Sequence, residues 1–349
     1  MDILIIDTGI YKVDSDIYYE AFHIADLLKN KFNVDIFKDR ILDKPDGANV
    51  KTFDEIIHKK YEMIISLNPS DFEYIIKYKK FSKYSPLIVF EDRFDFIDYL
   101  YNNKRNLFTK NFMKIIQNIA VYIGITEKIV NKARRVLSGI DIEYLPPYIS
   151  EKHFAENKNN NYEFEILFSS ILDRKKSDLD TLIKAVKFIS KSDFAERNNF
   201  TIDIFSNGID CDYLKKQISK NKLDDYFVFN DSDKYEFLSD NIRKHKTAVI
   251  IPVKHAFPNE ELSCLANGVP VLIDSEFNNF IRDTQNDYRD LAEKIMLMLY
   301  SDLSKMKEIA KNTAIKISAN WNLKFISIID KAVETLNKSK YDGEIESKL

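Results

Sequence analysis

The chain has 349 residues, with 52 Lys and Arg against 55 Asp and Glu, and its formal net charge at pH 7 is −3. This balance provides no uniform field to hold a polyanion, which argues against nucleic acid as the main partner. Because single hydrophobic cores stop growing near ~250–300 residues, the length predicts two domains.

The first residues and the cysteines indicate the compartment. The start MDILIIDTGI has no basic segment followed by a long apolar stretch and a small-residue cleavage site, as a signal peptide would have. No run reaches the ~18–20 apolar residues of a membrane helix. Cys211 and Cys264 have neither a disulfide framework nor a metal-ligand spacing. We therefore expect a soluble, cytoplasmic protein without a metal site.

Short β-branched and apolar runs alternate with longer amphipathic stretches in the first half of the chain. Such alternation is typical of βαβ units on a buried parallel sheet. Residues 18–32 have apolar side chains at helical spacing. The sequence therefore predicts a doubly wound α/β domain. Its strands are predicted at 2–8, 33–37, 61–67, 86–92 and 120–126.

Residues 103–119 predict an amphipathic helix. An apolar stripe that includes Leu107, Phe112 and Ile116 lies opposite several lysines and Arg105. Packing of this stripe on the sheet is one interpretation. The alternative is a peripheral membrane contact, because basic amphipathic helices also lie on anionic membrane surfaces.

Residues 144–165 contain two adjacent prolines and then an Asn-rich run, which predicts the linker between two domains. The alternation restarts beyond it, and the tail from Tyr288 to about Lys340 is expected to be helical throughout. The expected domains are 1–150 and 151–325, followed by a C-terminal helix and tail at 326–349. In the second half, strands are predicted at 164–170, 200–208, 226–231, 247–253 and 269–274, and helices at 178–190, 212–222, 235–244 and 260–267.

The stretch HAFPNEELSCLANGVPVLID, residues 255–274, follows a predicted strand, and ligands of doubly wound sheets bind at the carboxyl ends of strands. Asn259 is expected to cap the helix that begins there, and Asn267 and Gly268 are expected to end it. Free amides and the positive end of the helix dipole would then form a seat for a phosphate.

The pattern FPN, then Leu262, then GVPV resembles the donor-site signature EGFPNxxLEAMAxGxPV of the family 4 retaining glycosyltransferases of GT-B fold. SSILDRKKSDLDTLIKAV and IFSNGID resemble the family's GRLxxxKGxDxLIxA and IVGxGP segments. The resemblance covers most of residues 164–325 and is weaker in the first domain. It implies an α/β, GT-B fold, with two Rossmann-like domains facing each other across a cleft. It also implies metal-free transfer, with retention, from a nucleotide sugar.

Two glutamates of the family's signature align with His255 and Ser263 in this sequence. In the family, the first lies near the sugar and its phosphate, and the second receives the ribose hydroxyls. A serine offers a weaker contact than a carboxylate, so Glu260 or Glu261 is a candidate replacement. The alternative is that both only complement the helix dipole. We interpret His255 as a catalytic residue, with a structural role as the alternative.

The resemblance also implies residues that hold the diphosphate. Lys176 falls on the family's lysine, and Arg174 is a candidate to replace the family's arginine, whose position is Ile171 here. A solvated basic loop is the alternative for this cluster. The predicted donor-binding residues are Arg174, Lys176, Ser206, Asn207, Pro258, Asn259, Glu260, Glu261 and Ser263.

The acceptor side is expected in the first domain. Thr8, Gly9, Glu91 and Asp92 come at the ends of predicted strands and should border the same cleft. Asp92 is the second predicted catalytic residue, because a carboxylate there can orient an acceptor hydroxyl. Acidic residues after strands also cap helices, which is the alternative.

The leading hypothesis is a cytoplasmic, bacterial glycosyltransferase of polysaccharide biosynthesis, with localisation at the inner face of the cell membrane as a further option. Its expected donor is a nucleotide sugar, with UDP-linked sugars favoured, and its acceptor a glycan, lipid-linked or protein molecule. The alternative is a non-catalytic GT-B-like subunit that binds an acceptor or supports an active partner, alone or as an oligomer. Another GT-B activity, such as a sugar-nucleotide epimerase, is the third hypothesis.

Overall fold

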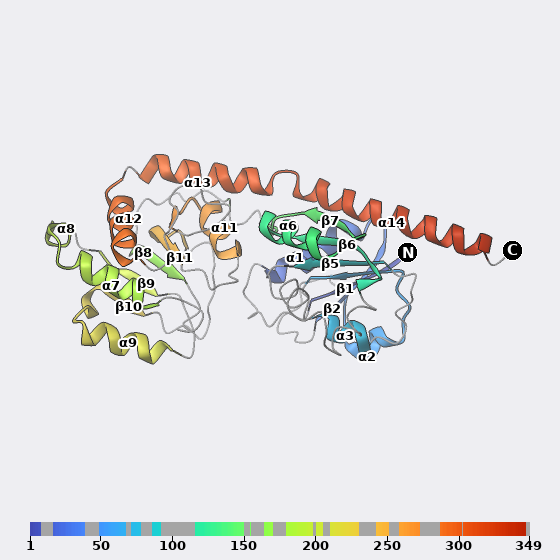
Figure 1. The fold of residues 1–349 in the computed structure, drawn as a ribbon, viewed down its shortest axis with the longest axis horizontal. Coiled ribbons are helices and arrows are strands. Elements are labelled where there is room, and N and C mark those ends of the chain that lie inside the picture. The colour runs from blue at the N-terminus through green and yellow to red at the C-terminus, as the bar shows by residue number, and fades with distance from the viewer. Residues whose placement is uncertain are drawn as a thin grey trace. The chain divides into compact units, whose positions relative to one another are not determined.

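A computed structural model divides the chain into two compact units (Figure 1). The first unit comprises residues 1–148 and 320–349, and the second comprises residues 149–319. Within the described ranges, no helix is long and apolar enough to cross a membrane. The structure describes residues 1–7, 17–38, 49–67, 71–77, 86–91, 116–149, 154, 164–169, 179–197, 200–204, 210–229, 242–250, 258–272, 287–301 and 303–346.

The first unit is built on a seven-stranded parallel sheet in the order β3-β2-β1-β4-β5-β6-β7. The five strands predicted in this half are confirmed. The sequence does not predict β3 and β7, because they are short and contain charged residues in place of an apolar run. The strands are β1 (Asp2–Ile6), β2 (Asn33–Phe37), β3 (Val50–Lys51), β4 (Met63–Ser66), β5 (Leu87–Glu91), β6 (Ile119–Gly124) and β7 (Asp141–Tyr144).

Helices cover both faces of this sheet. Along β1, Leu4 and Ile6 lie in one buried cluster while Ile3 and Ile5 lie in the other, as the alternation of a strand requires. Side chains of α2, α3 and α6 join the first cluster, and those of α1 and α14 join the second. Burial on both faces explains why the central strands are nearly continuous apolar runs. The helices are α1 (Ile17–Leu28), α2 (Phe53–Ile57), α3 (Phe72–Lys77), α6 (Glu127–Val136) and α14 (Trp321–Glu346).

The place of α14 differs from the expected division of the chain. The sequence predicts residues up to 325 in the second domain and a separate tail beyond them. In the structure, Trp321, Phe325 and Ile329 pack among buried side chains of β1, β4 and β5. The chain therefore returns to the first unit after it completes the second, because an apolar stripe of α14 covers one face of the first sheet.

The second unit is built on a five-stranded parallel sheet in the order β10-β9-β8-β11-β12. All five strands correspond to predicted ones, so the expected architecture of two parallel α/β domains is confirmed. The strands are β8 (Phe164–Ser169), β9 (Ile202–Ile204), β10 (Phe227–Phe229), β11 (His245–Ile250) and β12 (Val271–Leu272). The helices are α7 (Leu179–Ile189), α8 (Asp193–Arg197), α9 (Cys211–Lys220), the 3-10 turn η3 (Asp224–Tyr226), α11 (Pro258–Ala266), α12 (Tyr288–Tyr300) and α13 (Leu303–Ser318).

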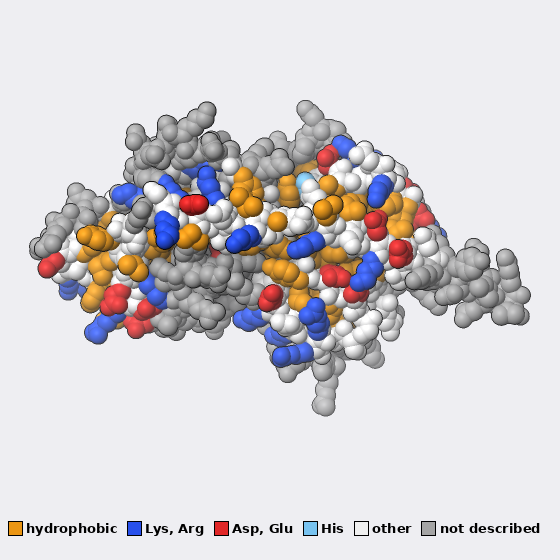
Figure 2. All heavy atoms as spheres, turned by 90° about the horizontal axis from the view of Figure 1, so that it is seen from above, with side chains coloured by type: hydrophobic (Ala, Val, Ile, Leu, Met, Phe, Trp, Pro, Cys, Tyr) orange, Lys and Arg blue, Asp and Glu red, His pale blue; other side chains and the backbone are white. Residues whose placement is uncertain are grey.

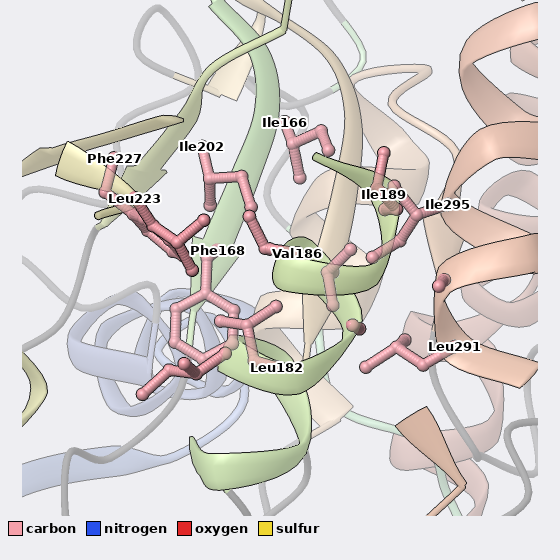
Figure 3. Close-up of a cluster of buried hydrophobic side chains, with 14 of the residues drawn as sticks. Ile166, Phe168, Leu182, Val186, Ile189, Ile202, Leu223, Phe227, Leu291 and Ile295 are labelled. Carbon is pink, nitrogen blue, oxygen red and sulfur yellow. The ribbon is translucent and has the colours of Figure 1, made fainter. Parts of the chain in front are cut away.

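The core of the second unit lies between its sheet and α7, α9 and α12. Figure 3 shows Phe168 of β8 beside Leu182 of α7, and Leu291 and Ile295 of α12 on the other side of α7. Because α7 has an apolar side chain on most sides, it packs against the sheet and α12 at once. The helix predicted at 178–190 is thereby confirmed.

The described part of the C-terminal tail is helical over nearly its whole length, as the sequence predicts, and it is divided into α12, α13 and α14. The first break follows Ser301, whose backbone is extended and whose hydroxyl donates to Leu297 O at 2.7 Å. The second falls at Asn320, which has a positive φ of 62° between α13 and α14. Asparagine tolerates the left-handed conformation better than most residues, so it can end one helix and begin another.

Two predicted helices lie largely outside the described residues. Of residues 103–119, only 116–119 are described, and Ile119 is the first residue of β6. Of residues 235–244, only 242–244 are described. On the face seen in Figure 2, basic, acidic and hydrophobic side chains are interspersed. Among the described residues of that face, this agrees with the balanced composition and shows no patch of a single sign of charge.

Candidate functional site

The strand order of the second unit reverses between β8 and β11. From β8 the chain moves through α7 to β9 on one side, and from β11 it moves through α11 to β12 on the other. Both crossovers are expected to be right-handed, which places α7 and α11 on opposite faces of the sheet. The carboxyl ends of β8 and β11 therefore border the topological switch point, where open α/β sheets bind ligands.

Helix α11 begins at this edge, since it follows β11 along the chain. Its residues from Glu261 to Ala266 are all buried, and it packs against β11, β12 and α13. Proline suits the first helical position, because its missing N–H would have no partner within the helix there. The amides that follow Pro258 and the positive end of the dipole form a setting for an anion.

The carbonyl end of α11 is a Schellman motif. The N–H of Val269 donates to Cys264 O at 2.8 Å, and that of Gly268 donates to Leu265 O at 2.9 Å. Gly268 has a φ of 72°, which is the left-handed conformation that the motif requires. Asn267 also donates from its side chain to Ser263 O at 2.8 Å. The predicted stop signals at Asn267 and Gly268 are confirmed.

The start of α11 differs from the prediction by two residues. Asn259 is expected to be the cap that precedes the helix, but the helix already includes Pro258 and Asn259. The proline explains the difference, because its fixed φ is already helical and extends the first turn backwards. The preceding residue, Phe257, lies outside the described ranges.

Of the residues predicted to bind the donor, the structure describes the side chains of Glu261 and Ser263. Glu261 is fully buried, and Ser263 is 4% exposed. On a helix with 3.6 residues per turn, positions two apart point in nearly opposite directions, so the two side chains leave α11 on different sides.

Other predicted donor-side residues lie outside the described ranges. Arg174 and Lys176 come in the segment that follows β8, and His255 comes in the segment that follows β11. Both segments leave the sheet at the switch point. Ser206 and Asn207 follow β9 and also lie outside the described ranges. The roles of these residues stay predictions.

The first unit has its own switch point between β1 and β4, since β2 lies on one side of β1 and β4 on the other. Asp7 directly follows β1 and is 3% exposed. Lys38 follows β2 and places its Nζ 3.0 Å from Asp7 Oδ2. The backbone N–H of Asp7 donates to Phe37 O at 3.0 Å, which continues the ladder to this point. An almost fully buried ion pair thus lies at the edge where acceptor-side residues are expected.

A second buried polar pair lies beside it. Ser66, the last residue of β4, donates from Oγ to Asp71 Oδ2 at 3.1 Å, and both residues are fully buried. Sequence reasoning did not single out these four residues. The available signal was a polar residue at the end of an apolar strand, in particular Asp7 and Ser66. Glu91 ends β5 as predicted, whereas Thr8, Gly9 and Asp92 lie outside the described ranges.

Asp35 centres a further polar network in the first unit. Its carboxylate, 2% exposed, accepts hydrogen bonds from Tyr61 Oη at 2.7 Å, from Lys59 Nζ at 2.8 Å and from Asn49. Lys59 also contacts Asp2 at the first residue of β1. Burial tends to lower the pKa of Lys59, but the hydrogen bonds and charges of Asp35 and Asp2 raise it overall. Because this network extends to the amino end of β1, we interpret it as structural.

We also interpret a buried pair in the second unit as structural. His245 Nε2 lies 3.1 Å from Asp203 Oδ2, and neither residue is exposed. His245 is the first residue of β11, at the end of that strand away from the switch point. Within the described parts of the chain, no group of His, Cys, Asp and Glu side chains has a metal-binding arrangement.

Comparisons with known proteins address the fold. No protein-family model matches the chain, and no curated protein matches its sequence. Among solved structures, the apo lipopolysaccharide outer core galactosyltransferase WaaB gives a TM-score of 0.63 at 11% identity, covering 96% of this chain and 99% of that chain. The pneumococcal O-GlcNAc transferase GtfA, in complex with UDP and GlcNAc, gives 0.66 at 10% identity, covering 95% and 99%.

The sucrose-phosphate synthase of Thermosynechococcus elongatus gives a TM-score of 0.65 at 15% identity, covering 99% of both chains. These proteins are similar to this chain over nearly its whole length. At such low identities the likeness establishes the fold, which is the GT-B type of two parallel-sheet α/β domains.

Proposed function

We propose that this protein is a retaining glycosyltransferase that uses a nucleotide sugar and needs no metal ion. The observation that carries the proposal is the position of α11. Its amino end follows β11 at the switch point of the second unit, it includes Pro258 and Asn259 of the FPN motif, and the GVPV residues 268–271 of the family 4 signature come directly after it. Fold similarity to glycosyltransferases, one of them in complex with UDP, supports the same reading and favours a UDP-linked donor.

The donor diphosphate would lie at the amino end of α11. Backbone amides of the first turn would donate to its oxygens, and the helix dipole would favour its charge. Lys176 and Arg174, which follow β8 at the neighbouring strand end, would supply the cations. Glu260, three positions before Ser263 in the sequence, would accept the ribose hydroxyls in place of the family's glutamate.

In the proposed transfer, the bond from the anomeric carbon to the diphosphate oxygen breaks, and a bond from that carbon to the acceptor oxygen forms on the same face. The proton of the acceptor hydroxyl passes to the departing diphosphate. The protein then needs no nucleophile, because it positions the substrates and stabilises charge that develops on the phosphate. Under this proposal, His255 contacts the sugar or its phosphate, and Asp92 orients the acceptor, which is a glycan, lipid-linked or protein molecule.

Ligand binding tests the proposal without knowledge of the acceptor. A ligand that binds the folded state alone raises the melting temperature, with about 2.7 kcal/mol of stabilisation at 100 times Kd. We expect UDP to stabilise the protein more than GDP, ADP or CDP. Lys176→Ala should remove most of the shift, and Lys175→Ala, a matched change at the adjacent position, should leave most of it. UDP-sugars should also release UDP slowly in water.

Failure of every nucleotide and nucleotide sugar to bind or to turn over would refute the proposal. Binding without turnover would instead support the second candidate, a non-catalytic subunit of the same fold. The observation that favours this candidate is the replacement of both motif carboxylates, by His255 and by the nearly buried Ser263. Co-purification with an active transferase would then identify its role.

A further inference from the structure

Exposed apolar side chains are concentrated on two consecutive helices of the second unit. In the described parts of the chain, six large hydrophobic residues are exposed, and four of them lie on α12 or α13. They are Leu297 and Tyr300 in the last turn of α12, and Ile309 and Ile315 on α13. Single exposed apolar residues are normal on a protein surface, whereas their concentration in one place marks an interaction surface.

Helix α13 also has a local positive charge. Its sequence contains four lysines and one glutamate, although the net charge of the whole chain is −3. Lys305 and Lys316 are exposed, and Lys307 and Lys311 are half-buried. Burial lowers the pKa of Lys307, and the neighbouring charge of Lys311 lowers it further. Because the charges of these two lysines repel each other, a negatively charged partner would stabilise this helix.

The buried and exposed residues of α13 lie on opposite sides of the helix. Ala310 and Ala314 are fully buried on the side that packs against α11. Lys305, Ile309 and Lys316 are four and seven positions apart, a spacing that brings them to one side, turned away from the two alanines. In Figure 2, which looks onto the side where Figure 1 draws α13, basic and hydrophobic side chains lie next to one another.

The composition of this side favours a lipid bilayer over a protein as the partner. Protein interfaces are depleted in lysine and enriched in arginine, but every cation of α13 is a lysine. A lysine can lay its apolar stem along a bilayer and keep its ammonium group among the headgroups. Tyrosine is enriched where membranes meet water, and Tyr300 is 82% exposed.

The α13 surface comprises six exposed residues, Leu297, Tyr300, Lys305, Ile309, Ile315 and Lys316. We propose that the second unit docks on anionic lipid bilayers through this surface. The lysines contact lipid phosphate groups, and the apolar side chains enter the headgroup region. The surface is separate from residues 103–119, for which the sequence alone suggests a membrane contact. The inference does not depend on the proposed transferase activity, because vesicle binding is measured without nucleotide sugar or acceptor.

Sedimentation with lipid vesicles tests the proposal on the intact chain. We expect binding to vesicles of equal parts phosphatidylcholine and phosphatidylglycerol, and much weaker binding to phosphatidylcholine alone. Each lysine near an anionic surface contributes about fivefold in affinity, so Lys305→Gln combined with Lys316→Gln should weaken binding about 25-fold. Added salt should also weaken binding of the parent protein, because ions screen the lysines. Ile315→Asn should weaken binding and leave its salt dependence unchanged.

Lys184→Gln combined with Lys191→Gln is the matched control. Both lysines are exposed, at α7 and just after it, and the change removes the same charge. Helix α7 lies on the opposite face of the sheet from α11, on which α13 packs, so this variant should bind as the parent does. Because all four lysines are exposed, both double variants should keep the melting temperature of the parent.

Four results would overturn the proposal. The first is equal binding of the parent to the two kinds of vesicle. The second is unchanged binding of the variant at Lys305 and Lys316, which would mean that other residues make the contact. The third is equal loss in the two double variants, since overall charge would then explain the effect. The fourth is equally tight binding to soluble polyglutamate, which would indicate an acidic protein as the partner.

Discussion

At the scale of single residues, the ion pair of Asp7 and Lys38 is the most consequential polar contact that the structure adds to the sequence. The Asp7 side chain is 2% exposed and that of Lys38 is 10% exposed. Removing one partner of a buried ion pair typically costs about 3–5 kcal/mol. We therefore expect Lys38→Met to destabilise the first unit by about 3 kcal/mol at neutral pH.

Urea unfolding followed by tryptophan fluorescence measures this effect. Trp321 is the only tryptophan and is buried in the first unit, so its emission reports that unit alone. The control is Lys31→Met, because the Lys31–Asp330 pair has side chains 57% and 54% exposed. Exposed pairs contribute about 0–1 kcal/mol. Equal losses in the two variants would show that burial does not set the strength of the Asp7–Lys38 pair.

Residue-scale features divide into those that local sequence predicts and those that it does not. Thr52 and Glu55 form a complete capping box at the start of α2, and such a pattern is visible within four residues. The partner of Asp7 lies 31 positions away, and the partner of His245 lies 42 positions away. No local pattern encodes these pairs. Pairing of β1 with β2 brings Asp7 to Lys38, and the strand order places β9 and β11 on the two sides of β8.

At the scale of elements, Gly268 is the position where backbone conformation and packing combine. Its φ of 72° disfavours any residue with a side chain, and an added Cβ would lie 2.9 Å from Lys311 Cε of α13. The left-handed conformation costs an L-residue roughly 1–2 kcal/mol. We expect Gly268→Ala to destabilise the second unit by about 2 kcal/mol, since displacement of the Lys311 side chain adds to that cost.

Unfolding followed by far-UV circular dichroism, with hydrogen exchange of the α11 amides, measures the loss. In the double variant that combines Lys311→Ala with Gly268→Ala, we expect to recover only the part of the lost stability that comes from displacement of the Lys311 side chain. Gly139→Ala in the first unit measures the cost of the left-handed backbone alone, because Gly139 has a φ of 82° and nothing lies within 4 Å of an added Cβ. If Gly268→Ala and Gly139→Ala had the same effect, the contact with Lys311 would contribute nothing.

The ends of the helices and strands show why the sequence predicts the fold more completely than the candidate donor site. All ten predicted strands occur, because most of them are apolar runs that are buried in the cores of the two units. The two missed strands, β3 and β7, are defined by pairing with a neighbour at the sheet edge, which their own residues do not reveal. Helix α11 begins at Pro258, whereas the sequence predicts a helix that begins at Glu260 with Asn259 as its N-cap. The predicted start is therefore two residues too late.

The candidate donor site was predicted from the residues of sequence motifs. Among the predicted donor-binding residues, the structure describes the side chains of Glu261 and Ser263. Sequence spacing places Glu260 and Ser263 on one side of a helix. It does not show that the side chains of residues 261–266 are all buried, because that depends in part on α13, which packs on α11 from more than 30 residues later in the chain. The burial of Ser263 is therefore information that the structure alone provides.

At the scale of the whole molecule, the first unit is not continuous along the chain, because it comprises residues 1–148 and 320–349. The first unit is completed only by α14, whose buried residues Trp321, Phe325, Ile328 and Ile329 cover one face of its sheet. Composition does not reveal this, since α12, α13 and α14 are consecutive amphipathic helices with similar content. The distinguishing features are Asn320, where helical geometry stops, and the buried hydrogen bond from Trp321 to Pro146.

Deletion of residues 320–349 should consequently unfold the unit at the other end of the chain. Burial of a large apolar side chain contributes about 1.5–3 kcal/mol, so the loss of these four removes on the order of 10 kcal/mol. That figure is comparable to the whole stability of a domain, about 5–15 kcal/mol. A fragment of residues 1–148 should therefore lack a cooperative transition by circular dichroism, whereas residues 149–319 should retain one. Joining residues 320–349 to the first fragment through a flexible linker should restore folding. Cooperative unfolding of residues 1–148 alone would show that α14 packs on a core that is already complete without it.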